Sequence, residues 1–136
     1  MAEVLVDSNV LLDVVTEDPR WFAWSSDALA RCAEEATLVV NPIIFAEVSI
    51  GFDRIEDVDE LLAEIVERAP LPWEAAFLAG KAFVRYRKHG GRRNSTLPDF
   101  YIGAHAAVAG MTLLTRDAAR YRTYFPGVHV IAPRPR

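Results

Sequence analysis

The sequence has little of several residue types that mark common classes of protein. Its 136 residues include one cysteine, Cys32, which excludes a disulfide framework and a thiolate metal cluster and favours a buried, inert thiol. The three histidines and the single cysteine form no pair or cluster of the kind that holds zinc. No segment approaches the ~20 apolar residues of a membrane span, and the N-terminus lacks the features of a signal peptide. We therefore expect a soluble, cytoplasmic protein with no membrane partner.

Basic residues are outnumbered as well. Fifteen lysines and arginines face 19 acidic residues, for a net charge of −4, which argues against a simple nucleic-acid-binding protein. A nuclease is not excluded, because bound metal would offset several acids. The basic residues are also uneven: one group runs from Arg85 to Arg93, and a second surrounds Asp117 (Arg116, Arg120 and Arg122). The first group is either a helix end, where cations complement the dipole, or a contact to RNA phosphates.

Hydrophobic residues make up 51% of the chain, enough for one well-filled core. Short apolar runs predict strands at residues 3–6, 37–40, 111–115 and 128–132. The segments between them predict helices at residues 10–15, 21–35, 42–50, 56–68, 73–88, 98–109 and 117–122. This alternation is typical of an α/β fold with a mainly parallel sheet. We expect one domain over residues 1–133 and a flexible tail over 134–136.

Four carboxylates stand at the ends of these apolar segments. Asp7 closes the first predicted strand, and Asp117 follows the third. Glu47 and Asp99 lie in helices that open with Asn41-Pro42 and with Pro98. Ligands of open parallel sheets bind at the carboxyl ends of the strands, so this topology can gather such acids. A pocket with nearly four negative charges predicts a divalent metal, because unpaired buried charge is strongly unfavourable.

The ligand types narrow the choice of metal. Mg²⁺ binds oxygen ligands, with one or two carboxylates plus waters and substrate phosphate. One or two such ions would suit hydrolysis of a phosphodiester, and the sequence leaves the number open.

Four segments together resemble the PIN-domain ribonucleases, and more narrowly the VapC toxins of bacterial toxin–antitoxin pairs. The segments are VDSNVLLD, NPIIFAEVSIGF, LPDFYIGAHA and LLTRDAARYRTYFP. The resemblance covers nearly the whole chain and is weakest over residues 52–95. It implies a three-layer α/β/α sandwich with a short, mainly parallel central sheet. It also implies a metal-dependent endoribonuclease that acts as the toxin of a type II pair, with Mg²⁺ or Mn²⁺ as cofactor.

Carried over residue by residue, the resemblance places the family's acidic quartet on Asp7, Glu47, Asp99 and Asp117. It implies that three of these acids, Asp7, Asp99 and Asp117, hold metal. The side chains expected to contact substrate are Asn9, Thr115 and Arg116. Arg116 is a candidate either for a phosphate contact or for pairing with one of the quartet.

The expected partners are RNA, a small VapB-like antitoxin and a second copy of the chain, in a heterotetramer or larger assembly with the antitoxin. The RNA target stays open between transfer, ribosomal and messenger RNA. The alternative function is a PIN-like module that has lost cleavage and only binds RNA or protein.

The remaining polar and aromatic residues have ordinary structural interpretations. We expect Asp13 on the exposed side of the first helix and His105 as a packing residue. The three tryptophans, Phe77, Phe83 and Phe100 are expected in the core or in a dimer surface rather than as platforms for bases. Helix 73–88 carries one largely apolar face, made of Trp73, Ala76, Phe77, Gly80, Phe83 and Val84.

Overall fold

Five parallel strands form the centre of the molecule. The computed structural model describes residues 2–91 and 97–134. The strands are β1 (Glu3–Val6), β2 (Thr37–Val40), β3 (Glu67–Arg68), β4 (Thr112–Leu114) and β5 (Val130–Ile131). Their order across the sheet is β3-β2-β1-β4-β5, and every neighbouring pair is parallel. The order places β1 in the middle, so its carboxyl end has a strand on either side.

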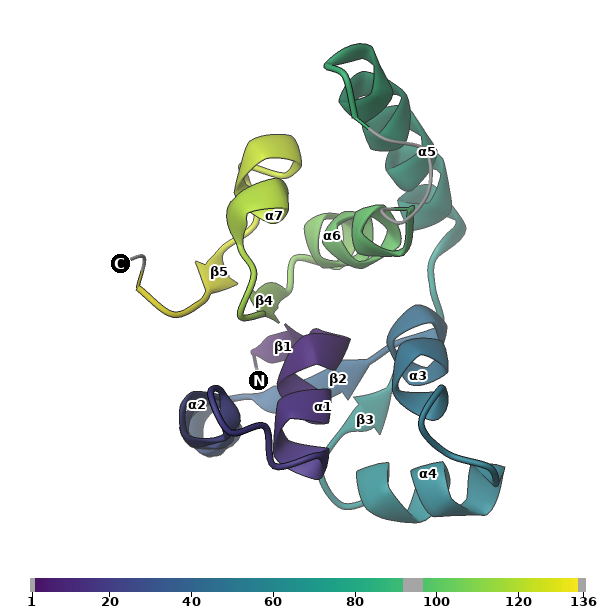
Figure 1. Cartoon of the computed structure of the whole chain (residues 1–136). Coiled ribbons are helices and arrows are strands. Elements are labelled where there is room, and N and C mark those ends of the chain that lie inside the picture. The colour runs from purple at the N-terminus through teal and green to yellow at the C-terminus, as the bar shows by residue number, and fades with distance from the viewer. Residues whose placement is uncertain (1, 92–96, 135–136) are drawn as a thin grey trace.

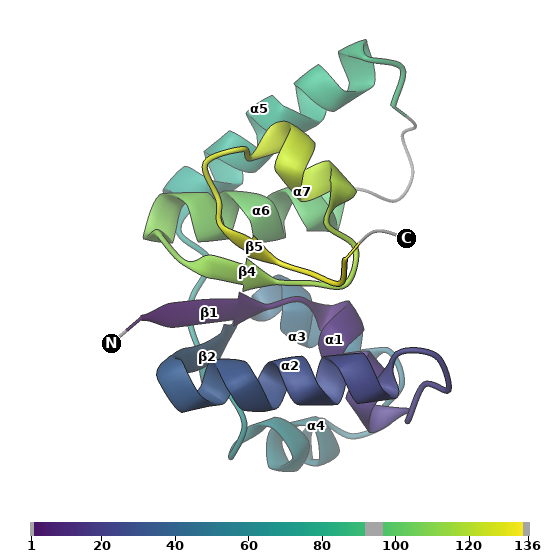
Figure 2. The ribbon, with the colours of Figure 1, turned by 90° about the vertical axis from the view of Figure 1, so that its left-hand side faces the viewer.

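Helices flank the sheet on both sides. They are α1 (Ser8–Val15), α2 (Phe22–Glu35), α3 (Pro42–Ser49), α4 (Ile55–Leu62), α5 (Trp73–Lys88), α6 (Leu97–Ala109) and α7 (Ala119–Tyr124). Figure 1 shows α6 and α7 on one side of the strands and α1 and α2 on the other. In Figure 2, α5, α6 and α7 gather at the end of the sheet that holds β5, away from α4. The predicted α/β/α sandwich with a parallel sheet is confirmed.

The core follows from strands that are apolar on both faces. Leu5, Val6, Leu113 and Leu114 have no exposed surface, as expected for central parallel strands covered by helices on each side. Helix α6 is apolar almost all round and packs against α3, α5 and α7. Cys32 is buried as predicted. No helix in residues 2–91 and 97–134 is long and apolar enough to cross a membrane.

The predicted helix at residues 56–68 is wrong in its second half. Helix α4 ends at Leu62, and Glu67 and Arg68 form strand β3 at the edge of the sheet. Both side chains are exposed, and the strand is two residues long. The strand is defined by its backbone pairing with Val39 and Val40 of β2. A polar two-residue strand has no alternating pattern, so nothing in the local sequence marks it.

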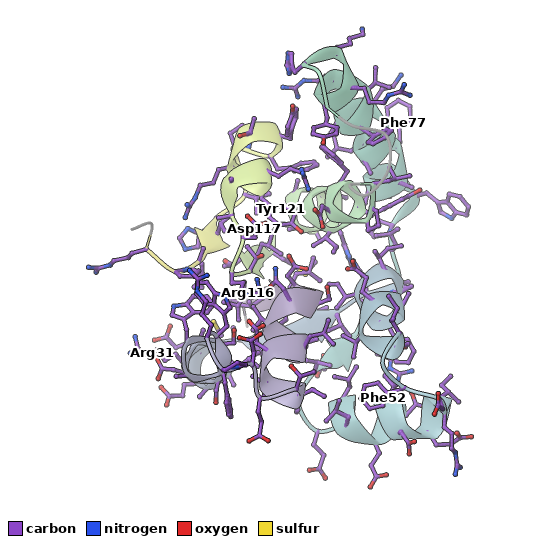
Figure 3. The ribbon with its side chains drawn as sticks, in the orientation of Figure 1. Arg31, Phe52, Phe77, Arg116, Asp117 and Tyr121 are labelled. Carbon is purple, nitrogen blue, oxygen red and sulfur yellow. The ribbon has the colours of Figure 1, made fainter. Side chains whose placement is uncertain are left out.

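Helix α5 packs mainly with a row of alanines, and only part of its large apolar face contributes to the core. Its buried residues are the small ones: Ala75, Ala79 and Ala82. Small side chains allow close packing against α6, and the partly buried rings of Phe83 and Tyr86 contact Phe100 of that helix. Other large side chains of α5 turn outward. Trp73 is 89% exposed and Phe77 is 69% exposed, so neither belongs to the core of this chain. In Figure 3, Phe77 points away from the body of the molecule.

Two local predictions hold at the start of α3 and in α6. The side chain of Asn41 accepts a hydrogen bond from the backbone N–H of Ile44 at 2.9 Å, and Pro42 occupies the first turn. His105 is 2% exposed, and its Nδ1 lies 3.0 Å from Nδ2 of Asn41. His105 is therefore the satisfied packing residue that the sequence predicts.

The basic group between Arg85 and Arg93 is only partly described. Arg85, Arg87 and Lys88 lie in the last turn of α5, which agrees with the helix-end interpretation. Arg92 and Arg93 lie outside the described residues, as do residues 135 and 136 of the predicted tail. A contact of this group to RNA stays a prediction.

Candidate active site

The four predicted carboxylates line one pocket at the carboxyl ends of β1 and β4. Its volume is ≈ 280 Å³. The pocket is lined by Asp7, Ser8, Asn9, Glu47, Asp99, Asp117, Ala119, Arg120 and Tyr121. We call it the acidic pocket. The structure therefore brings together acids from two strand ends and two helices that lie up to 110 positions apart in the chain (117 − 7 = 110).

Asp7 lies at the floor of the acidic pocket, with 4% of its surface exposed. Its backbone N–H donates to the carbonyl of Leu114 at 2.9 Å, which extends the pairing of β1 with β4 by one residue. Although Asp7 precedes α1, its side chain makes no capping hydrogen bond. Its Oδ2 instead accepts hydrogen bonds from the hydroxyls of Thr115 and Tyr121, each at 2.9 Å. These two hydroxyls hold the carboxylate toward the pocket.

Glu47 enters the pocket from α3 and is half-buried. Its Oε1 accepts a hydrogen bond from the hydroxyl of Ser8 at 3.0 Å. The same hydroxyl lies 3.5 Å from Oδ1 of Asp7, at the limit of a hydrogen bond. Ser8 thus stands between two carboxylates and links α3 to the end of β1.

Asp99 lies in the first turn of α6, where the helix dipole favours a negative charge. Its Oδ2 accepts a hydrogen bond from Nη1 of Arg120 at 2.5 Å, and each side chain is 32% exposed. Among the residues that line the acidic pocket, Arg120 is the one that carries a positive charge. One guanidinium therefore offsets part of the charge of four carboxylates.

Asp117 is the exposed member of the quartet and follows β4. Its backbone N–H donates to Oγ1 of Thr115 at 3.2 Å. The residue at the N-cap of α7 is Ala118, and no side chain caps that helix. Asp117 is thus not the N-cap of α7. Figure 3 shows Asp117 beside Tyr121, with Arg116 below them next to α1.

Burial and mutual repulsion disturb the protonation of three of the four acids. Burial raises the pKa of Asp7, although the Thr115 and Tyr121 hydrogen bonds act in the opposite direction. Burial also raises the pKa of Glu47 and of Asp99, and the charge of Asp7 adds to both effects. Arg120 lowers the pKa of Asp99 without cancelling these contributions. The pocket therefore concentrates negative charge that its own residues do not neutralise.

The predicted substrate-contact residues lie under or beside the quartet. Thr115 has no exposed surface, and its hydroxyl is engaged with Asp7. Asn9 is half-buried: its Nδ2 donates to Oγ1 of Thr115 at 3.2 Å, and its Oδ1 accepts from the backbone N–H of Arg116 at 3.3 Å. In this structure, Asn9 and Thr115 hold the turn that carries Asp117. A direct contact to substrate stays a prediction.

The expectation that Asp13 is exposed is wrong. Asp13 is 2% exposed, and its Oδ2 accepts hydrogen bonds from Oγ of Ser25 at 2.7 Å and Nε of Arg116 at 2.9 Å. Helix α2 and the turn after β4 cover this face of α1 and supply both partners. Arg116 therefore pairs with Asp13 and not with a member of the quartet.

Three polar residues of the acidic pocket were not predicted as site residues: Ser8, Arg120, which was noted only as part of a basic group, and Tyr121. Ser8 follows Asp7 directly, and its role depends on Glu47, 39 positions away. Arg120 and Tyr121 lie three and four positions after Asp117, at helical spacing. That spacing was a usable signal for side chains that face back toward the strand ends.

The lining of the acidic pocket fits a hard divalent cation. All four acidic side chains offer oxygen ligands, and the lining contains no histidine or cysteine. In the described part of the chain, no group of three or more Asp, Glu, His or Cys side chains has the arrangement needed to hold a metal ion. Mg²⁺ takes one or two protein carboxylates and completes its shell with water and phosphate, so a looser arrangement suits it.

Comparison with known proteins supports this architecture. A family model described as "PIN domain" matches residues 4–126. The fold resembles the structure of VapBC2 from Rickettsia felis bound to a promoter DNA fragment, with a TM-score of 0.74 and 17% identity over 97% of this chain and 99% of that chain. It also resembles VapBC-1 from nontypeable Haemophilus influenzae, with a TM-score of 0.71 and 18% identity over 96% and 97%. No curated protein matches the sequence. At these identities the structures show a shared fold.

Proposed function

The chain belongs to the PIN-domain family, and on this premise we propose that it is a metal-dependent endoribonuclease that hydrolyses phosphodiester bonds in RNA. One observation carries the proposal: Asp7, Glu47, Asp99 and Asp117 line a single pocket whose charge is largely uncompensated. Groups with perturbed pKa values cluster at functional sites, and a group of facing carboxylates is otherwise unfavourable.

Mg²⁺ is the proposed cofactor, with Mn²⁺ as the alternative. Asp7, Asp99 and Asp117 would hold it, since they stand at the ends of β1, α6 and β4 around one cavity. A divalent cation supplies positive charge for the phosphate oxygens and lowers the pKa of a bound water. Thr115 and Tyr121 keep Asp7 oriented through their hydroxyl hydrogen bonds.

Glu47 is the proposed base. Its pKa is raised by burial and by the nearby Asp7 and Asp99, which makes it a better proton acceptor than an ordinary glutamate. The hydroxyl of Ser8 fixes its position. In the hydrolysis, the water oxygen bonds to phosphorus, and Glu47 accepts the proton of that water. The P–O bond to one ribose oxygen breaks, and this oxygen takes a proton from solvent and leaves as a hydroxyl.

The proposed biological role is that of the toxin in a type II toxin–antitoxin pair. Support comes from the fold, which resembles chains solved in VapBC complexes. We expect a VapB-like antitoxin to place a basic side chain over the acidic pocket. We also expect a homodimer, for which the exposed apolar side chains of α5 offer a surface to bury. Size-exclusion chromatography with light scattering, alone and with the antitoxin encoded beside it, would measure both assemblies.

The activity is tested with purified protein and RNA in the presence of Mg²⁺, Mn²⁺ or EDTA. Cleavage should require the metal, and Asp7→Asn or Asp99→Asn should abolish it while thermal unfolding stays cooperative. Sequencing of RNA ends after induced expression, with Asp7→Asn as the control, should identify the target and the cut site. Wild-type rates in either variant would show that the quartet is not the catalytic centre.

The same experiment separates the enzyme from a silent binding module. A module that only binds RNA or protein should neither cleave nor gain stability from Mg²⁺. An enzyme should do both, since a ligand that binds only the folded state raises its stability.

A further inference from the structure

A second pocket adjoins the acidic pocket and has the opposite charge. Its volume is ≈ 550 Å³, and it shares Asp117 and Ala119 with the acidic pocket. Its other side chains with charge or an aromatic ring are Arg20, Trp21, Arg116, Arg122 and Arg134. We call it the arginine pocket. In a chain with a net charge of −4, four guanidinium groups beside one carboxylate are a local concentration of positive charge.

Trp21 provides an aromatic surface within this pocket. The ring is half-buried and stands edge-on to Trp24, with 6.4 Å between centroids. The guanidinium carbons of Arg20 and Arg116 lie 5.1 and 5.6 Å from its centroid. Trp21 lies outside the core of this chain and lines a pocket open to solvent, while a place for it in a dimer surface stays a prediction.

Two carboxylates hold the backbone at Trp21 and the side chain of Arg116 in place. Oδ1 of Asp18 accepts hydrogen bonds from the backbone N–H groups of Arg20 and Trp21, both at 2.9 Å. Arg116 is anchored by the buried carboxylate of Asp13. A fixed ring and a fixed guanidinium lose little conformational freedom when a ligand binds.

The other three arginines can turn toward a ligand, and Arg20, whose guanidinium lies over the Trp21 ring, must leave that face for a base to stack on it. Arg20, Arg122 and Arg134 are exposed, and within residues 2–91 and 97–134 they form no ion pair with a carboxylate. An arginine contacts a phosphate through two parallel N–H bonds and also stacks on a base. The arginine pocket thus combines an aromatic platform with phosphate contacts, the combination that binds single-stranded nucleic acid.

We propose that the arginine pocket binds the single-stranded RNA segment next to the cleaved phosphodiester, with one base stacked on Trp21 and its phosphates on Arg20, Arg122 and Arg134. The proposal rests on the proposed function, which places the cleaved phosphodiester in the acidic pocket. Because the two pockets meet at Asp117 and Ala119, the strand passes from one to the other. The base must be unpaired, since a base inside a duplex cannot reach an aromatic ring.

Binding measured without cleavage tests this site independently of the nuclease activity. The probe is a short, fluorescein-labelled, single-stranded oligoribonucleotide in EDTA, followed by anisotropy. Trp21→Leu keeps apolar bulk but removes the ring, and should weaken binding by about fivefold to about 150-fold, the range for loss of one base–aromatic stack. Trp21→Phe keeps an aromatic face and should retain most of the affinity. The same strand in an RNA duplex should bind more weakly than the single strand.

The charge contribution has its own matched pair. A plot of log K against log salt has a negative slope, and Arg122→Ala should make it shallower by roughly 0.7, the value for one phosphate contact of a single strand. Arg31→Ala is the control, because Arg31 is an exposed arginine that pairs with Asp27 on α2 outside the arginine pocket. Thermal unfolding of each variant shows whether it is folded.

The outcomes separate the two proposals. If Trp21→Leu and Arg122→Ala weaken binding and Arg31→Ala does not, the RNA site holds even in a protein that fails to cleave. If wild type and Trp21→Leu bind the single strand equally, the RNA site is refuted even in an active nuclease. Binding of an acidic peptide to this pocket without any loss of RNA affinity in the variants would likewise refute it and assign the pocket to a protein partner.

Discussion

Asp7 and Asp13 lie six positions apart and are almost equally buried, yet their surroundings are opposite. Asp13 is 2% exposed and accepts hydrogen bonds from a guanidinium and a hydroxyl. Asp7 is 4% exposed, and its side-chain hydrogen-bond donors in the described residues are hydroxyls. Its charge also raises the pKa of two nearby carboxyl groups, Glu47 and Asp99. Burial alone therefore does not distinguish these two acids, whereas the presence of a paired cation does.

The physical reason lies in the free energy of burying charge. Removing a carboxylate from water is unfavourable by several kcal/mol, and a well-placed cation recovers much of that. At Asp13 the recovery comes from Arg116 within the chain. At Asp7 no cation of residues 2–91 or 97–134 forms an ion pair, and Arg120 offsets charge one carboxylate away, at Asp99. The remaining deficit is what a divalent ion would supply.

The two regions are also joined. Arg116 reaches Asp13 through its side chain and Asn9 through its backbone N–H. Asn9 in turn donates to Thr115, which donates to Asp7. The neutral, satisfied cluster around Asp13 therefore supports the turn that carries part of the charged pocket.

The largest effect on stability is expected from removing the carboxylate of Asp13, which is paired with a cation. Asp13→Ala leaves Arg116 without its partner in a site that is mostly dry and leaves the Ser25 hydroxyl unpaired. We expect a loss of about 3 kcal/mol in the free energy of unfolding, toward the lower end for a broken buried pair because Arg116 is 32% exposed. Urea denaturation measures it. Asp27→Ala, which breaks the exposed pair with Arg31, is the control and should change stability by less than about 1 kcal/mol.

If Asp13→Ala were as stable as Asp27→Ala, the contrast between the two buried aspartates would have no energetic basis. The variant also reports on the connection between the regions. Its cleavage rate at a temperature where it is folded should fall, because the support of Asn9 and Thr115 is weakened.

The next effect concerns the hydroxyls that replace a cation at Asp7. Tyr121→Phe keeps the buried ring and removes the hydrogen bond to Oδ2. Residues that orient a metal ligand typically change metal affinity or activity by about 10- to 100-fold, so we expect a loss in that range. Titration of Mg²⁺ followed by thermal shift, beside the cleavage rate, separates affinity from rate. Tyr124→Phe on the same helix is the control, and an equal loss there would remove the special role of Tyr121.

The sequence predicts the acidic pocket better than it predicts the surroundings of Asp13. The quartet was predictable because each acid has a local sign: a strand that ends, or a proline that opens a helix. The burial of Asp13 was not, because its partners Ser25 and Arg116 lie 12 and 103 positions away. A hydrophilic residue on an amphipathic helix has exposure as its default, and only the packing of α2 overrides it.

The fold shows the same division. Strands β1, β2 and β4 are short apolar runs and were predicted, whereas β3 consists of Glu67 and Arg68 and is recognised only by its pairing with β2. Helix α5 was predicted as a helix, but its packing face was not. Large residues dominate a sequence pattern, whereas the fully buried residues of α5 are alanines and only some of its large residues, such as Phe83, pack against the core.

The smallest effect is a gain in stability, whereas Asp13→Ala is expected to lose stability. Asp7→Asn removes a buried charge that lacks a cation, so the metal-free variant should be more stable than wild type at neutral pH. The gain should be on the order of 1 kcal/mol, the usual size of a single substitution. Because burial raises the pKa of Asp7 in the folded state, the folded protein binds this proton more tightly than the unfolded chain. The stability of metal-free wild type should therefore fall as pH rises from the ordinary pKa of an aspartate through the raised one.

The difference between wild type and Asp7→Asn should close again in acid, where the aspartate is protonated in both the folded and the unfolded state. Added Mg²⁺ should also close it at neutral pH, by stabilising wild type and not the variant. Denaturation at a series of pH values, with Mg²⁺ and with EDTA, measures all three trends. A variant that is less stable than wild type in EDTA would mean that the hydroxyls of Thr115 and Tyr121 already satisfy the charge of Asp7. In that case Asp7, like Asp13, would be a structural acid, and the argument for a metal at this position would lose its energetic support.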